Sequence, residues 1–134
     1  MDLEIRDATP DDNEAMSRLD MAIFPDNCFN ETTLRAELEV GGGYIAIIER
    51  EAVGYSLFRI ERGLVDILRL GVLETVRCKG LGGALLALSM RQGRKAMLTV
   101  KKTNRIAINL YLKHGFSITG HIPQGNYWVM MTSS

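Results

Sequence analysis

The chain has 134 residues, of which 46% are hydrophobic and 24% are charged, as is typical of one soluble globular domain. Lys plus Arg and Asp plus Glu each number 16, so the formal net charge is zero, whereas proteins that bind the nucleic-acid backbone usually carry a basic excess. These values exclude a disordered tail, a collagen-like fibre and a disulfide-stapled miniprotein, and they argue against a nucleic-acid partner. We expect a single domain over residues 1–134.

Cysteine use and the first residues favour the cytoplasm. Cys28 and Cys78 are too few for a disulfide framework and neither belongs to a C-x-x-C pair, so we expect two free thiols. Met1 is followed by acids rather than by a basic and then apolar leader, which argues against a secretory signal. No stretch reaches the roughly 18 consecutive apolar residues of a membrane helix, so we expect no membrane partner.

Apolar residues recur with two periods along the chain: every second residue in strand-like segments and every third or fourth in helix-like segments. Turn signals separate these segments, including Phe24-Pro25 and the three glycines at 41–43. In chain order, the pattern predicts a strand at 2–8, a helix from Thr9 to Ile23, a short helix from Asn30 through Leu38, strands at 44–48, 52–60 and 64–73, a helix from Gly80 to about Arg91, a strand at 96–100, a helix at 103–114 and strands at 116–119 and 127–131.

This element order predicts a mixed α/β fold in which helices cover a mixed sheet. The glycine inside the strand at 64–73, Gly71, is expected to mark a β-bulge. Gly115 follows the last predicted helix at the position that favours left-handed backbone, so it is expected to end that helix.

The segment from the strand at 64–73 into the next helix carries the clearest chemical signal. Gly80 and Gly82 let the backbone turn sharply and approach a ligand, and the loop opens onto a helix whose free amides attract anions. Arg77 and Lys79 add cations that suit phosphate oxygens. The segment therefore predicts a pyrophosphate cradle, although the same glycines also fit plain tight packing. It is neither a Walker loop nor a dinucleotide fingerprint, because Leu85 stands where the latter needs a glycine.

A second pattern, N-x-x-A-x-x-L-Y-x-x-x-G-F, begins at Asn104 and contains Tyr111. Together with R-x-x-G-x-G, which starts at Arg77, it resembles the GNAT superfamily of acetyl-CoA-dependent N-acetyltransferases over essentially the whole chain. The resemblance implies a central, mostly antiparallel sheet of about seven strands flanked by about four helices, with a V-shaped splay between the fourth and fifth strands.

The resemblance also implies where acetyl-CoA binds, without a metal. The loop amides would hold its pyrophosphate, the splayed strand would pair with its pantetheine arm, and Asn104, which also fits a plain helix cap, would contact that arm. The implied cofactor-binding residues are Leu70, Gly71, Val72, Arg77, Cys78, Lys79, Gly80, Leu81, Gly82, Gly83, Ala84, Asn104 and Tyr111.

The implied reaction is direct transfer in a ternary complex. An amine attacks the thioester carbonyl, backbone amides stabilise the oxyanion, and Tyr111 protonates the departing thiolate. Tyr111 also fits a buried core aromatic. Related enzymes that act on protein N-termini often carry a glutamate where this chain has Thr99, so the base is open. Asp66 and Glu74 are the candidate bases, and each also fits an ordinary solvated acid.

The first two helices and the final hairpin are implied to bind the acceptor. Phe24-Pro25 resembles a dipeptide of ribosomal-protein alanine N-acetyltransferases, and Tyr127 can line a peptide groove, so Phe24 and Tyr127 are candidate substrate residues. A protein or peptide amino group is the first choice of acceptor, and a small amine such as a polyamine or amino acid is the second. A non-catalytic acyl-CoA-binding module is the alternative of another class. A monomer and a homodimer both stay open.

Overall fold

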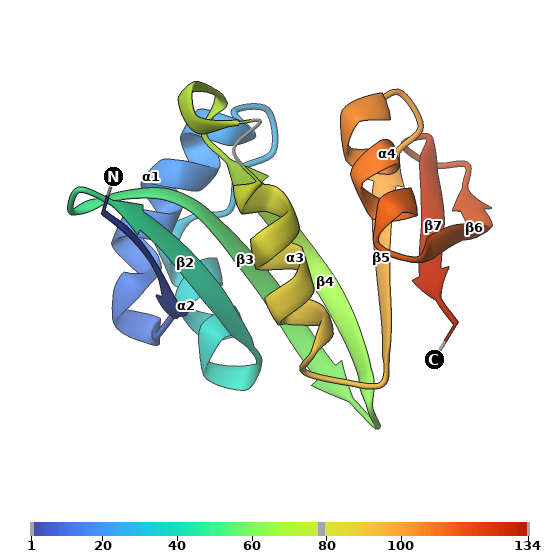
Figure 1. Ribbon diagram of the computed structural model, residues 1–134, viewed down its shortest axis with the longest axis horizontal. Coiled ribbons are helices and arrows are strands. Elements are labelled where there is room, and N and C mark those ends of the chain that lie inside the picture. Colours follow the sequence, from blue (N-terminus) through green and yellow to red (C-terminus); the bar gives the residue numbers. More distant parts are fainter. Residues whose placement is uncertain (1, 78–79, 134) are drawn as a thin grey trace.

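The computed structural model describes residues 2–77 and 80–133, which form one sheet with helices on both faces (Figure 1). The elements are β1 (Leu3–Asp7), α1 (Asn13–Ile23), α2 (Glu31–Val40), β2 (Gly42–Ile48), β3 (Glu51–Glu61), β4 (Leu64–Val72), α3 (Leu81–Met90), β5 (Lys95–Lys101), α4 (Arg105–Lys113), β6 (Phe116–Ile122) and β7 (Tyr127–Thr132), with short 3-10 turns at Pro10–Asp12 and Glu74–Val76. None of the helices within the described ranges is long and apolar enough to span a membrane.

The sheet has seven strands in the order β1-β2-β3-β4-β5-β7-β6. All neighbouring strands are antiparallel except β4 and β5, which are parallel. The parallel pair shares only three residue pairs, from Leu64↔Lys95 to Asp66↔Met97, and the two strands then separate (Figure 1). The mixed α/β class, the element order and the splay between the fourth and fifth strands are therefore confirmed.

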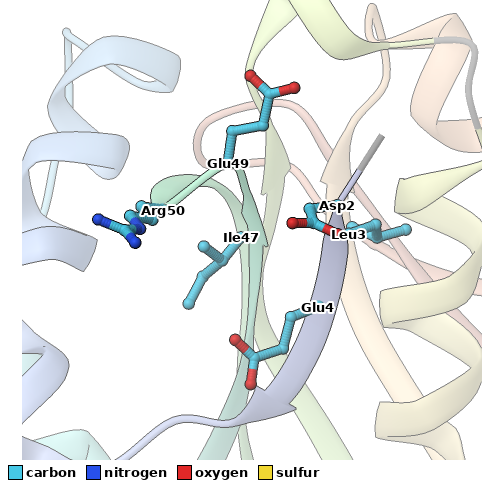
Figure 2. Close-up of a pocket in the computed structure, with 6 residues that line it drawn as sticks. All are labelled: Asp2, Leu3, Glu4, Ile47, Glu49 and Arg50. Carbon is cyan, nitrogen blue, oxygen red and sulfur yellow. The ribbon is translucent and has the colours of Figure 1, made fainter.

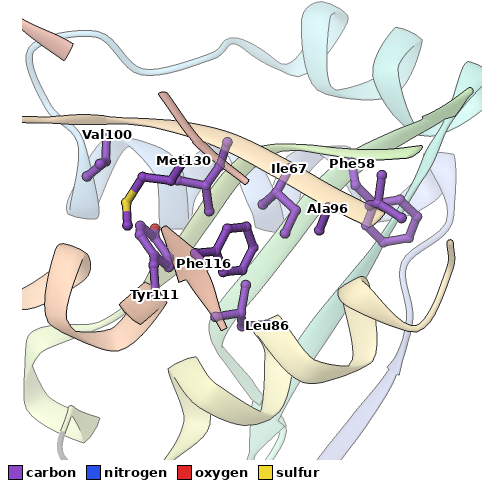
Figure 3. Packing of buried hydrophobic residues seen from close by; sticks show 10 residues of the cluster. Phe58, Ile67, Leu86, Ala96, Val100, Tyr111, Phe116 and Met130 are labelled. Carbon is purple, nitrogen blue, oxygen red and sulfur yellow. The ribbon is translucent and has the colours of Figure 1, made fainter. Parts of the chain in front are cut away.

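Apolar side chains hold the helices on both faces of the sheet. Met16 and Leu19 of α1 are buried against one face, as the helical spacing predicts. A second cluster lies under α3 and α4 and contains Leu86, Tyr111 and Phe116 (Figure 3). This second cluster includes residues of both β4 and β5, so it joins the two halves of the sheet across their separation.

The three glycines at 41–43 are not simply a break before the next strand. β2 begins at Gly42, two residues earlier than predicted, because the glycines allow close contact with the neighbouring strand. A Cβ on Gly43 would overlap the carbonyl oxygen of Ser56 on β3. The sequence pattern reads glycines as a turn, but here they belong to the pairing of two strands.

The bulge predicted at Gly71 is wrong in position. Gly71 pairs regularly with Tyr55, whereas the register shifts where Leu57 faces Arg69 and Phe58 faces Ile67, which leaves Leu68 as the extra residue. Gly71 instead lets the end of α1 pack closely against β4. A Cβ there would lie 3.0 Å from Cδ1 of Ile23, at the end of α1.

The last two strands are longer than predicted. β6 extends to Ile122 rather than ending at 119, and its register against β7 shifts between Ile118 and Gly120. Glycine and polar residues in this stretch hide the strand pattern, because β6 is an edge strand with mostly exposed side chains.

Replacing Gly43 with Ala tests the close approach of β2 and β3. The added methyl group would overlap a backbone carbonyl that cannot move alone, so Gly43→Ala should lower the free energy of unfolding by about 2 kcal/mol. The control is Gly120→Ala, whose Cβ would meet only the Val129 Cβ at 3.9 Å and should cost less than about 0.5 kcal/mol. Urea unfolding measures both, and equal stabilities would contradict the assignment.

Candidate active site

Most of the predicted site residues, with the exception of Asp66, lie toward one end of the sheet. Because β4 and β5 are parallel and each is followed by a helix, α3 and α4 both begin at this end (Figure 1). The loop at 24–30, between α1 and α2, and the β6–β7 hairpin reach the same end. The separation between β4 and β5 therefore opens toward the end of the sheet where these two helices begin and these two loops lie.

The glycines at the start of α3 have two different structural roles. Gly80 caps the helix in left-handed backbone, with φ of 79°, and a Cβ there would have no atom within 4 Å. Gly82 and Gly83 instead face α4: a Cβ would lie 3.5 Å from Leu110 on the first and 3.3 Å from His114 on the second. The open position at Gly80 suits the predicted anion cradle, whereas Gly82 and Gly83 leave room for the side chains of Leu110 and His114.

Arg77 is bound to the end of β4. Its Nε donates a hydrogen bond to the carbonyl oxygen of Val72 at 3.2 Å. This bond holds the Arg77 side chain at the end of β4, in the segment that leads to α3, and a guanidinium suits phosphate oxygens. Cys78 and Lys79, which were also assigned to the cradle, lie outside the described residues.

The splayed part of β4 is the predicted pantetheine-binding strand. Val72 and Leu70 contribute to the clusters on the α3 face, and Gly71 between them faces Ile23 and Phe24. Beyond Asp66 this strand has no pairing with β5. An edge of this kind offers backbone groups to an extended ligand.

Tyr111 lies in the cluster under α3 and α4, 8% exposed, and its ring centroid is 5.8 Å from that of Phe116 (Figure 3). Burial raises the pKa of its hydroxyl to about 12, so the phenol stays protonated at neutral pH. Full transfer to a thiolate of ordinary thiol pKa, about 8.5, would then be uphill by about 5 kcal/mol. A different order of events costs less energy. The Tyr111 hydroxyl first donates a hydrogen bond to the thiolate sulfur, and the proton is transferred only when burial has also raised the pKa of the thiol.

Asn104 caps α4 as one of its two expected roles predicts. Its Oδ1 accepts a hydrogen bond from the backbone N–H of Ala107 at 3.2 Å. The cap uses the amide oxygen, so the side-chain NH₂ of this exposed residue is the group suited to a ligand carbonyl. The proposed contact with pantetheine stays a prediction.

The two candidate bases are not brought together. Asp66 is half-buried in the last pair with β5, whereas Glu74 is exposed in the turn after β4, about 20 Å further along an extended strand. Burial raises the pKa of the Asp66 carboxyl; Arg59 opposes this rise and Glu37 adds to it. Thr99, which stands where related enzymes have an acid, is exposed on β5.

The two candidate acceptor residues lie on either side of the strand separation. Phe24 packs on β4, where a Cβ on Gly71 would lie 3.1 Å from its Cε2. Tyr127 begins β7, beyond β5, and its ring contacts Gly125 of the hairpin. An acceptor that enters between them would meet both walls.

A buried ion pair beneath the 24–30 loop was missed by sequence reasoning. Asp20 of α1 is fully buried and lies 3.1 Å from Nε of Arg69 on β4. Burial raises the pKa of the Asp20 carboxyl, while Arg69 and the Phe29 N–H lower it. The signal was present: each charge interrupts a stripe that is otherwise apolar, and opposite charges in two buried stripes indicate a pair.

A hollow at the other side of the sheet holds none of the predicted site residues. Figure 2 shows that it is lined by residues at the start of β1 and at the end of β2 with its turn into β3: Asp2, Leu3, Glu4, Ile47, Glu49 and Arg50. β2 and β3 separate it from the splay.

Comparisons with known proteins find similarity to acetyltransferases. The model of the acetyltransferase (GNAT) family matches residues 4–116. An N-alpha-acetyltransferase of Sulfolobus acidocaldarius is 31% identical over 132 residues, covering 84% of this chain and 79% of that protein. One from Sulfurisphaera tokodaii is 35% identical over 91 residues, covering 54% of this chain and 54% of that protein, so the match spans about half of that relative.

Two solved structures share the architecture. Arabidopsis thaliana Naa50, in complex with the bisubstrate analogue CoA-Ac-MVNAL, superposes with a TM-score of 0.86 at 25% identity over the whole of both chains. The ribosomal-protein-S18-alanine N-acetyltransferase from Escherichia coli gives a TM-score of 0.84 at 18% identity, over 98% of this chain and 93% of that one, which shows the fold. With the family match over most of its length, the chain belongs to the GNAT family of acetyltransferases, which are acyltransferase enzymes.

Proposed function

We propose that this protein moves an acetyl group from acetyl-CoA to a primary amine, and that the acceptor is the amino group of a protein or peptide. The observation that carries the proposal is the separation of β4 from β5 beyond Asp66, in the strand that leads to the Gly80 turn and α3. The relatives named as N-alpha-acetyltransferases, and a neighbour bound to a CoA–peptide analogue, support a peptide α-amino group.

Acetyl-CoA fits the donors that this end of the sheet offers. The first amides of α3 and the Arg77 guanidinium suit its pyrophosphate, because both are positive and Gly80 leaves space beside them. The splayed edge of β4 suits the amides of the pantetheine arm, which would pair as an added strand. The Asn104 side-chain NH₂ adds a donor from the start of α4.

In the proposed reaction, the amine nitrogen attacks the thioester carbonyl carbon, the new C–N bond forms, and the C–S bond breaks. A β4 backbone amide donates to the carbonyl oxygen as negative charge develops there. The Tyr111 hydroxyl donates a hydrogen bond to the leaving sulfur, and its proton follows as the C–S bond breaks. A carboxylate receives the amine proton, directly or through water, and Asp66 and Glu74 are the two candidates: burial raises the pKa of the Asp66 carboxyl, and Glu74 lies exposed in the turn after β4.

Turnover of acetyl-CoA against a panel of amines tests the function. We expect acetylation of peptides with a free α-amino group, with higher kcat/KM than for polyamines or free amino acids. Release of CoA thiol and peptide mass measure it. Faster turnover of a polyamine would replace the peptide acceptor with a small amine. Tight acetyl-CoA binding without transfer to any amine would instead identify a non-catalytic module.

Replacing Tyr111 with Phe tests the proton donor. The ring keeps its place in the cluster, so stability should change little, while kcat should fall about 100-fold and KM for acetyl-CoA should stay within about twofold. Because burial raises the pKa of Tyr111 to about 12, the difference from the unsubstituted protein should persist up to pH 10.

Tyr44→Phe is the matched control for that experiment. Tyr44 lies on β2, and its hydroxyl accepts a hydrogen bond from Gln92 outside the proposed site. It should leave kcat within about twofold. Equal losses in both variants, or no loss in Tyr111→Phe, would remove the proposed role.

Replacing Gly80 with Ala tests the cradle. Because Gly80 has left-handed backbone, Gly80→Ala should lower the free energy of unfolding by about 1 kcal/mol. The added methyl group also enters the open space beside α3, so the affinity for acetyl-CoA should fall about tenfold. Gly115→Ala is the control, because Gly115 has φ of 91° and is equally open, at the far end of α4. Calorimetric titration compares them; a similar loss of affinity in both would make backbone strain alone the cause.

A further inference from the structure

We propose that Arg69 is a positioning residue for the acceptor: it fixes the loop at 24–30 against the part of β4 that has separated from β5. The effect on acceptor binding rests on the proposed function, whereas the anchoring of the loop rests on contacts within the described residues. The sequence motifs do not assign a role to Arg69, which shares β4 with one other charged residue, Asp66.

Arg69 contacts the loop at three points along its length. Its Cζ lies 4.4 Å from the centroid of the Phe24 ring and 4.2 Å from that of Phe29. Between these two aromatic residues, the carbonyl oxygen of Asn27 accepts a hydrogen bond from Arg69 Nη2 at 2.7 Å. One side chain therefore holds the beginning, the middle and the end of the loop.

Asp20 fixes the guanidinium from beneath. Its carboxylate lies 3.1 Å from Arg69 Nε and accepts from Nη2 at 3.3 Å. The same carboxylate accepts the backbone N–H of Phe29 at 2.6 Å and the hydroxyl of Tyr55 on β3. The anchor therefore joins α1, β3, β4 and the loop, and removing one partner leaves a buried charge uncompensated.

The chemistry of this anchor requires arginine. A planar guanidinium can lie against two aromatic rings while its N–H groups bind a carboxylate and a carbonyl in its own plane. A lysine ammonium keeps the charge but has neither the flat faces nor the fixed fork of donors. Lysine at position 69 should therefore keep the ion pair with Asp20 and release the rings.

The anchored loop lies on the strand where transfer is proposed. Gly71 is two residues beyond Arg69, and its missing side chain lets the Phe24 ring approach β4. This contact is between Leu70 and Val72, the residues proposed to pair with pantetheine. Movement of the loop would therefore change the acceptor side of the strand, while the Gly80 turn and Arg77 would stay in place.

The kinetic test compares Arg69→Lys with Arg6→Lys. Arg6 of β1 also binds a carboxylate near α1, with two contacts of 2.9 Å to Asp12, but at the opposite end of that helix from the loop. We expect Arg69→Lys to raise KM for the acceptor peptide about tenfold and to leave KM for acetyl-CoA within about twofold. Arg6→Lys should leave both constants unchanged. An equal rise in both constants, or none, for Arg69→Lys would overturn the proposal.

A second measurement does not depend on activity. Hydrogen exchange should become faster at the backbone amides of residue 24 and residues 26–30 in Arg69→Lys, with the Phe29 amide included, and should be unchanged there in Arg6→Lys. Unchanged exchange in Arg69→Lys would overturn the anchoring. If the loop loosens while the unsubstituted protein acetylates no amine, the anchoring stands and the proposed function fails.

Phe29→Leu keeps the test decisive if Arg69→Lys does not fold. It removes one ring from the guanidinium but retains an apolar side chain and the whole ion pair with Asp20. Exchange at 24–30 and KM for the acceptor should both rise, by less than in a folded Arg69→Lys. No change in either quantity would overturn the proposal.

Discussion

The parallel pairing of β4 and β5 stops after three residue pairs, and the rest of the structure is arranged around that interruption. Strands β1–β4 and strands β5–β7 would otherwise be held together by very few backbone hydrogen bonds. The cluster under α3 and α4 compensates, because it includes side chains from both strands and from both helices. Gly82 and Gly83 leave room beside the start of α3 for the side chains of Leu110 and His114. Opening the sheet for a ligand thus depends on a strongly packed layer behind it.

Tyr111 shows how closely packing and proposed chemistry are combined. It is part of the layer that holds the two halves together, and the same burial raises the pKa of its hydroxyl. The charges along the separated part of β4 also differ between its two ends. Arg77 and the start of α3 provide a positive side, whereas Asp66 provides a carboxylate at the point where the strands part. Zero net charge is therefore compatible with binding both a polyanion and a cationic amine.

Local patterns predicted most of the fold, because helix and strand periods, helix caps and turn glycines are properties of neighbouring residues. The Gly80 turn and the Asn104 cap belong to this class. The early start of β2 and the register shift at Leu68 could not be predicted, because each depends on contact with another strand. The ion pair of Asp20 and Arg69 joins residues that lie 49 positions apart, although two charges in apolar stripes were visible.

The extra residue at Leu68 has a consequence for which side of the sheet each β4 residue faces. Before it, Val65 and Ile67 face α3 and α4; after it, Leu70 and Val72 do so, although alternation alone would place them opposite. Arg69 is thereby turned toward α1. If the same residues paired regularly, without the bulge, Arg69 would share a face with Val65 and Ile67, and its guanidinium would enter the apolar layer under α3. The single extra residue thus decides which β4 side chains pack under α3 and α4 and which lie against the loop that is proposed to face the acceptor.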